Sequence, residues 1–151
     1  MLDITNLQMY RENNRLEAKE ALGGLPESIW ETYSAFANAQ GGVILLGVKE
    51  RPDKTLQALD LLDPQWLMED FWAVVRDPAR VSVNLLSRED VQILQAEGKR
   101  IIAITVPPAG KEQKPVYLMG EPYRHTYLRR GEGDYRCSRE EVDDMFRQAK
   151  E

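Results

Sequence analysis

The sequence is poor in the residues on which several common protein classes depend. Its 151 residues include one cysteine, Cys137, and one histidine, His125. A single cysteine cannot form an internal disulfide, and these two residues cannot supply a set of zinc ligands. Because His125 is the only candidate base, the sequence shows no pattern typical of a Ser–His nucleophile triad. We therefore expect a reducing, cytoplasmic setting and a function that uses other side chains.

Long apolar runs and internal divisions are missing as well. The longest apolar stretch covers only residues 43–48, whereas a membrane-spanning helix needs roughly 20 apolar residues. Residues 1–15 lack the apolar core of a secretory signal. No repeat, low-complexity run or Pro/Gly/Ser-rich linker divides the chain. We expect one compact domain over residues 1–151, either a stand-alone protein or the N-terminal domain of a longer one.

The overall charge restricts how the chain could bind nucleic acid. Hydrophobic residues make up 42% and charged residues 30%, as in soluble globular proteins. The formal net charge is −5 and the sequence pI is about 5.1. An acidic domain has no general field that attracts a polyanion, so any phosphate contact must come from a local basic patch. The sequence also lacks the G-x(4)-G-K-[ST] loop of P-loop ATPases.

One helix–turn–strand unit stands out near the N-terminus. Apolar side chains recur at the spacing of a single helical face, at Ile29, Tyr33, Phe36 and Ala37. Gly41 stands where a helix end needs a left-handed residue, which glycine adopts at little cost. The apolar run 43–46 then indicates a strand buried on both faces. The pattern predicts a helix over 26–40 and a strand over 42–49 that ends at Lys49 and Glu50.

The remaining patterns predict an α+β domain with a mixed, mostly antiparallel sheet and about three helices. Asp63 and Pro64 form a good start for a second helix that ends by Pro78. Ser138 and Glu141 form a capping box for a last helix over 139–149. Strands are expected at 55–59, 81–85, 91–95, 100–106, 115–118 and 125–129, with a strand or frayed helix at 16–20 and a turn at 131–134.

Four segments resemble the Schlafen AlbA-type domain, in order and over nearly the whole chain. They are RENNRLEAK at 11–19, AFANAQGGVILLGVKE at 35–50, IIAITVPP with KPVY at 101–108 and 114–117, and TYLRRG at 126–131. The resemblance implies a Schlafen AlbA-like fold. It also implies a nucleic-acid-binding module, for DNA or RNA, of the kind found in transcriptional regulators and RecG-like helicase-related proteins.

The resemblance further implies an acidic site. Glu12, Glu17 and Glu50 match the three acidic residues of the family's nuclease branch, and Lys19 would assist them. Three carboxylates can hold Mg²⁺ or Mn²⁺ beside a scissile phosphate. Glu50 replaces the aspartate usual at its position. Glu12 and Glu17 are five residues apart, so neither a helix nor a strand brings them together. They converge only if the chain bends between them, at residues 13–14.

A second group of candidates is basic. Arginines alternate with tyrosines between residues 123 and 139, and arginine binds phosphate while tyrosine stacks on unpaired bases. The expected phosphate contacts are Lys19, Lys49, Arg124, Arg129 and Arg130. In the alternative interpretation, these arginines pair with acids of the last helix and the glutamates are solvated surface residues.

Three functions remain open from the sequence. The first is a nucleic-acid-binding module, and the second is a metal-dependent endoribonuclease. The third is a protein-interaction or oligomerisation module, in which the chain pairs with copies of itself or with a C-terminal region of a longer protein.

Overall fold

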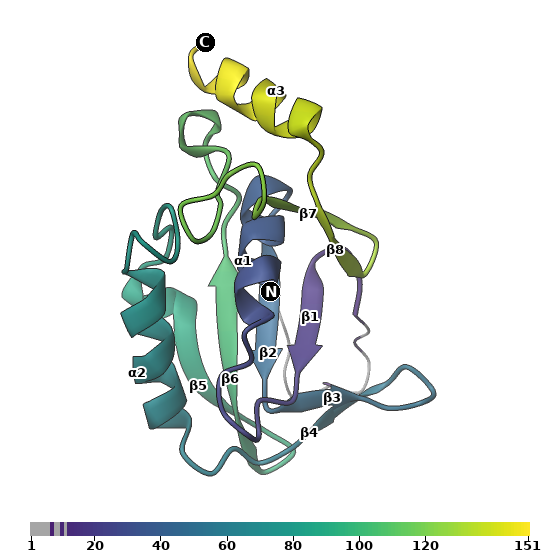
Figure 1. Cartoon of the computed structure of the whole chain (residues 1–151). Helices are drawn as coiled ribbons and strands as arrows, with labels where there is room; N and C mark the ends of the chain where they lie inside the picture. Colours follow the sequence, from purple (N-terminus) through teal and green to yellow (C-terminus); the bar gives the residue numbers. More distant parts are fainter. Residues whose placement is uncertain (1–6, 8–9, 11) are drawn as a thin grey trace.

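A four-stranded sheet forms the centre of the protein, and the computed structural model describes residues 7, 10 and 12–151. The strand order is β1-β2-β6-β5, as Figure 1 shows. β1 pairs with β2 in parallel, and the other neighbours pair antiparallel. The strands are β1 (Leu16–Lys19), β2 (Gly42–Leu46), β5 (Val91–Ala96) and β6 (Lys99–Val106). The expected mixed, mostly antiparallel sheet is confirmed, and so is the hairpin of β5 and β6 across residues 97–98.

Two helices cover one face of this sheet. α1 (Ile29–Asn38) provides the crossover that a parallel pair such as β1 and β2 requires, and it lies in front of the sheet in Figure 1. α2 (Pro64–Val75) packs beside it against β5 and β6. Asp63 caps α2 by accepting a hydrogen bond from the Trp66 amide, and Pro64 opens the helix, both as predicted. The apolar side chains of both helices join those of the sheet in one core.

The opposite face of the sheet carries a smaller core. It is covered by the antiparallel pair β3 (Val48–Glu50) and β4 (Leu56–Ala58), together with the buried Leu7. The single strand predicted over 42–49 is therefore split. Gly47 separates β2 from β3 with a φ of +83°, and a Cβ there would lie 2.7 Å from Leu61 Cγ. The chain turns at Gly47 out of the central sheet, which places Glu50 on the second hairpin.

The C-terminal part forms a separate hairpin and a terminal helix. β7 (Tyr127–Arg130) pairs antiparallel with β8 (Gly133–Arg136), and α3 (Arg139–Ala149) follows. The capping box of Ser138 and Glu141 is formed as predicted. α3 lies against the short 3-10 helix η3 (Lys111–Gln113), at the end of the molecule opposite β3 and β4 (Figure 1). A further 3-10 helix, η2 (Arg88–Asp90), precedes β5.

The strands expected at 81–85 and 115–118 do not form. These segments make only isolated bridges, Val81 with Leu118 and Tyr117 with Thr126. Side chains take the place of a strand ladder: the Tyr33 hydroxyl donates to the Val83 carbonyl at 2.8 Å and accepts from the amide of residue 85 at 2.9 Å. The alternating apolar pattern thus reflects packing onto α1. No helix in the described part of the chain is long and apolar enough to cross a bilayer.

Candidate functional site

A tight turn brings Glu12 back alongside β1. The Asn13 amide donates to the Leu16 carbonyl at 3.0 Å, and the Asn13 side-chain oxygen accepts from the Arg15 amide at 2.7 Å. The chain therefore reverses where the sequence suggested a bend. The Glu12 carboxylate then accepts a hydrogen bond from the Ala18 amide at 2.8 Å.

Glu17 and Lys19 lie on the face of β1 that points towards α1. Their partners across the parallel ladder are Ile44 and Leu46, both of which belong to the core under α1. Lys19 Nζ lies 3.5 Å from Glu17 Oε2 and donates to Ser28 Oγ at 3.1 Å. The two-residue spacing thus places the acid and the base side by side, as the period of a strand requires.

Arg129 connects this strand to the C-terminal hairpin from inside the protein. Its guanidinium lies 2.9 Å from Glu17 Oε1 and 2.7 Å from Asp134 Oδ1, and only 1% of its side chain is exposed. It also donates to the carbonyls of Asn13 and Leu16 and lies 4.9 Å from the ring centroid of Phe36.

The position of Arg129 counts against its expected role as a phosphate contact. All three nitrogens of its guanidinium donate to groups within the protein. A cation that is buried and whose nitrogens all bond within the protein is poorly placed to contact a ligand outside. We therefore leave Arg129 out of the interface proposed below.

The three glutamates lie within one electrostatic environment. Burial is the largest cause that raises the pKa of Glu12, and the charges of Glu17 and Glu50 raise it further. The hydrogen bond from Ala18 and the charge of Arg129 oppose these effects. Glu50, at the end of β3, also pairs with Lys54 at 3.5 Å. We call Glu12, Glu17, Lys19, Glu50, Arg129 and Asp134 the charged edge of β1.

The carboxylates of the charged edge, as placed, do not fit a metal ion. Glu12 is bound to a backbone amide, Glu17 to two cations and Glu50 to Lys54. Over residues 7, 10 and 12–151, no group of three or more acidic, histidine or cysteine side chains is arranged to hold a metal. A metal ligand must direct a lone pair at the ion, and each of these carboxylates already directs at least one at a protein donor. We therefore derive no metal-dependent step from this geometry.

The other expected basic contacts are spread over separate elements. Arg130, on β7, forms an ion pair with Glu141 of α3, and its side chain is 59% exposed. Arg124 is exposed and lies 3.5 Å from Glu121 in the loop before β7. Lys49 is half-buried on β3. The pairing of Arg130 with the last helix matches the alternative interpretation given above.

Asp134 is a member of the charged edge that the sequence interpretation missed. It was assigned to a turn, whereas it lies on β8 directly opposite Arg129. Thr32 of α1 donates to its second oxygen at 2.6 Å. A two-residue turn at Gly131 and Glu132 would have predicted this pairing, since such a turn fixes the register of a hairpin.

The fold and the order of its segments place the chain among known proteins. It belongs to the Schlafen AlbA_2 family, whose model matches residues 12–138. It is similar to the solution structure of an N-terminal domain from Nitrosomonas europaea, part of a protein named for its relation to the ATP-dependent DNA helicase RecG. The identity is 30%, the TM-score is 0.65, and the match covers 91% of this chain and 94% of that domain.

A more distant structure supports the fold alone. A crystal structure of a Corynebacterium diphtheriae protein matches at 21% identity with a TM-score of 0.58. That match covers 89% of this chain but 24% of the larger protein. A comparison with curated proteins finds no significant match.

Proposed function

We propose that the chain is a nucleic-acid-binding module, for DNA or RNA, of a transcriptional regulator or helicase-related protein. Its family membership and its similarity to a domain of a RecG-related protein support this proposal. The structural observation that carries it is the outer face of the β7–β8 hairpin, where a cation and an aromatic ring lie together.

Hairpin register decides which side chains share this outer face. Leu128 pairs with Tyr135 and Arg130 with Gly133. Because side chains alternate along a strand, Arg130 and Tyr135 project to the side opposite Arg129 and Asp134. Both are exposed.

The Tyr135 ring lies over Gly133, the cross-strand partner of Arg130. A Cβ on Gly133 would lie 2.9 Å from a Tyr135 ring carbon, so the ring covers the residue that pairs with Arg130. Arginine binds phosphate oxygens and a tyrosine face stacks on an unpaired base. This pair is suited to one nucleotide of a single strand.

Contacts on the inner face of the same hairpin hold its outer face in a fixed position. Arg129 joins the hairpin to β1 through Glu17 and to its own second strand through Asp134. Lys19 and Lys49 lie on neighbouring strands, β1 and β3. Because Lys19 already pairs with Glu17 and Ser28, these lysines add positive charge near the hairpin, and Arg130 remains the open phosphate contact. Recognition residues held on strands keep a more exact geometry than residues held on loops.

The charges around Arg130 predict weak, salt-sensitive binding. Glu141 already pairs with Arg130, so a phosphate must displace a carboxylate from an exposed site. The net charge of −5 adds no long-range attraction. With one to three phosphate contacts, the logarithm of affinity should fall with the logarithm of salt with a slope of roughly −1 to −3.

The test is a titration with labelled single-stranded DNA, duplex DNA and structured RNA at low salt. Loss of the Tyr135 ring in Tyr135→Ala should weaken single-strand binding by roughly 5- to 100-fold, the range for one stacked base. Arg130→Ala should weaken binding and reduce the salt slope by about 1. Arg147→Ala, which removes an exposed arginine from α3, is the control. Unchanged affinity in both hairpin variants would refute the proposed surface.

The convergence of the three glutamates favours a second candidate, a metal-dependent endoribonuclease that uses Mg²⁺ or Mn²⁺. The pairing of each carboxylate with protein groups counts against it. The same titrations, repeated with each metal and examined on a denaturing gel, separate the two candidates. Cleavage that requires the metal and disappears in Glu17→Gln would establish the nuclease, and intact nucleic acid would support the binding module.

A further inference from the structure

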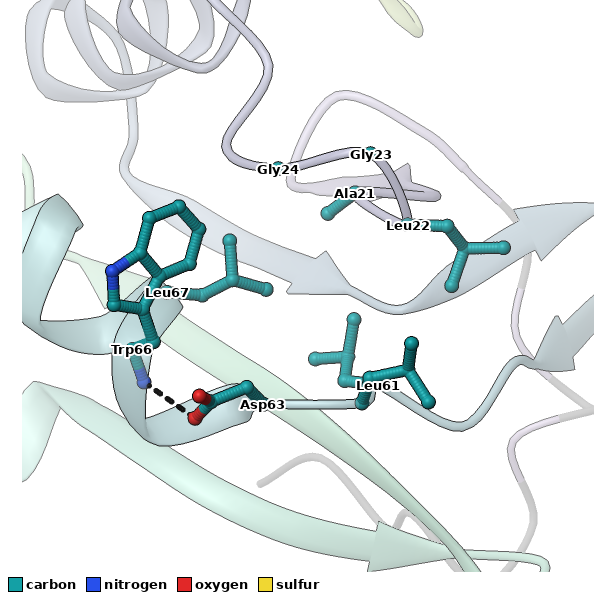
Figure 2. A pocket seen from close by; sticks show the side chains of 9 residues that line it. Ala21, Leu22, Gly23, Gly24, Leu61, Asp63, Trp66 and Leu67 are labelled. Carbon is teal, nitrogen blue, oxygen red and sulfur yellow. Dashed lines mark hydrogen bonds between the residues drawn. The ribbon is translucent and has the colours of Figure 1, made fainter.

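A second surface feature lies away from the β7–β8 hairpin. The loop that follows β1 and the segment that leads into α2 enclose a pocket of about 290 Å³. Figure 2 shows Leu22 extending from the loop towards Leu61, with Trp66 of α2 bordering the other side. Its lining consists of Ala21, Leu22, Gly23, Gly24, Leu61, Leu62, Asp63, Trp66 and Leu67.

Large apolar side chains are exposed around this pocket. Leu22 is 55% exposed, Leu62 is 88% exposed and Trp66 is 56% exposed. The base of the pocket is well packed, because Leu61 and Leu67 belong to the main core. Contiguous exposed apolar surface marks interaction sites, and a tryptophan in such a surface is a frequent source of binding energy.

The charged residue that lines the pocket is acidic, and Arg100 of β6 lies close enough to interact with it electrostatically. Among the described residues that line the pocket, Asp63 is the charged one. Its carboxylate accepts a hydrogen bond from the Trp66 amide at 3.0 Å. The start of α2 is therefore already satisfied by a carboxylate and does not attract an anion. Asp70 lies one turn beyond Trp66, at the i+4 position of the same helical face, and Glu20 precedes the loop. Both are exposed.

We propose that this pocket docks a segment of a partner protein that inserts one large apolar side chain and carries lysine or arginine beside it. The volume is at the lower end of the range for ligand pockets, so it admits a side chain or two and not an extended ligand. The surrounding carboxylates select a basic segment over an acidic one. A second copy of this chain is disfavoured, since a symmetric contact would bring the same acids together.

The surface is independent of the proposed nucleic-acid contact. It is built from the β1–α1 loop and the start of α2, whereas Arg130 and Tyr135 lie on β7 and β8. The module could therefore hold a protein partner and a nucleic acid at the same time. Failure of one proposal leaves the other in place.

Three capped tetrapeptides test the chemistry on the full chain: Arg-Leu-Phe-Arg, Glu-Leu-Phe-Glu and Arg-Ala-Ala-Arg. Amide shifts in a ¹⁵N NMR titration report both affinity and location. The first peptide should shift the amides of Leu22, Leu62 and Trp66, and the other two should bind at least about tenfold more weakly. Equal binding of all three peptides, or no shift with millimolar Arg-Leu-Phe-Arg, would overturn the proposal.

Two variants separate the apolar and the charged contributions. Trp66→Ala should weaken the first peptide at least about thirtyfold, which corresponds to the loss of one hot-spot side chain. Asp63→Asn keeps the helix cap and removes the charge, so it should weaken binding a few-fold and remove part of its salt dependence. Met119→Ala, at another exposed apolar residue, is the matched control. Peptide binding that survives both variants would refute the site, as would a concentration-dependent dimer that disappears in Trp66→Ala.

Discussion

Replacement of Arg129 by methionine should destabilise the protein strongly although no apolar core residue is removed. The substitution keeps much of the side-chain length and its contact with Phe36 while it deletes the charge. Glu17 and Asp134 are then left without their nearest cation, and the carbonyls of Asn13 and Leu16 each lose one of their donors. Removal of one partner from a buried ion pair costs about 3–5 kcal/mol.

Urea unfolding followed by circular dichroism measures this loss of free energy. In a domain of this size each 1 kcal/mol lowers the melting temperature by about 2–4 °C, so a decrease of roughly 6–20 °C should accompany it. Arg130→Met is a closely matched control, because the neighbouring arginine forms an exposed ion pair worth about 0–1 kcal/mol.

A double-mutant cycle tests the assigned mechanism. If the cost arises from a stranded carboxylate, Asp134→Asn should be less damaging in the Arg129→Met background than in the wild type. A loss below about 1 kcal/mol in Arg129→Met, or additive effects in the cycle, would refute the view that Arg129 holds β1 and the hairpin together.

Other predictions concern the core, the backbone and two titratable groups. Asn38→Ala should cost about 3 kcal/mol in urea unfolding, because the buried Val116 amide loses its acceptor and the carbonyls of residues 116 and 127 each lose one donor. Gly41→Ala should cost more than about 1 kcal/mol, since φ is +77° and the new Cβ would lie 2.7 Å from a carbonyl oxygen; Gly23→Ala, with open space and no positive φ, should be nearly neutral. The pKa of Glu12 is raised above its ordinary value of 4.5, so the folded state binds the proton more tightly than the unfolded chain does. The stability that this group contributes is therefore present below pH 4.5 and is lost as the pH rises through the raised pKa. The free energy of unfolding, measured across pH, should lack this loss in Glu12→Gln. If the wild type and Glu12→Gln gave parallel curves of unfolding free energy against pH, the prediction would be wrong. Burial raises the pKa of the Cys137 thiol to about 11, so a thiol reagent at pH 8 should label the folded protein far more slowly than the urea-unfolded chain.

Local signals predicted the parts of the fold that depend on local chemistry. The start of α2 follows from Asp63 and Pro64, and the start of α3 follows from the capping box at Ser138. The hairpin of β5 and β6 follows from two apolar runs around a glycine turn. These features depend on neighbours in the sequence, so the sequence alone reveals them.

Features that depend on distant contacts were not predictable in this way. An alternating pattern at 81–85 cannot show that the Tyr33 hydroxyl binds the segment's backbone. Arg129 looked like a surface cation because Glu17 and the carbonyls that bind it come from the other end of the chain. The family resemblance indicated that Glu12, Glu17 and Glu50 belong together. Only the structure shows that Asp134 joins them and that each of these four carboxylates already bonds to another group of the protein.

The contacts of Arg129 also bear on the order in which the protein is made. This side chain binds carbonyl groups of residues that precede it by 116 and 113 positions. β1 leaves the ribosome early, but its edge acquires these bonds only when the β7–β8 hairpin has been synthesised, since domains fold as units during synthesis. A nascent chain that stops before Arg129 leaves Glu17 without this arginine and the edge of β1 without its donor. Folding of the domain therefore joins its first strand to a hairpin from its C-terminal part.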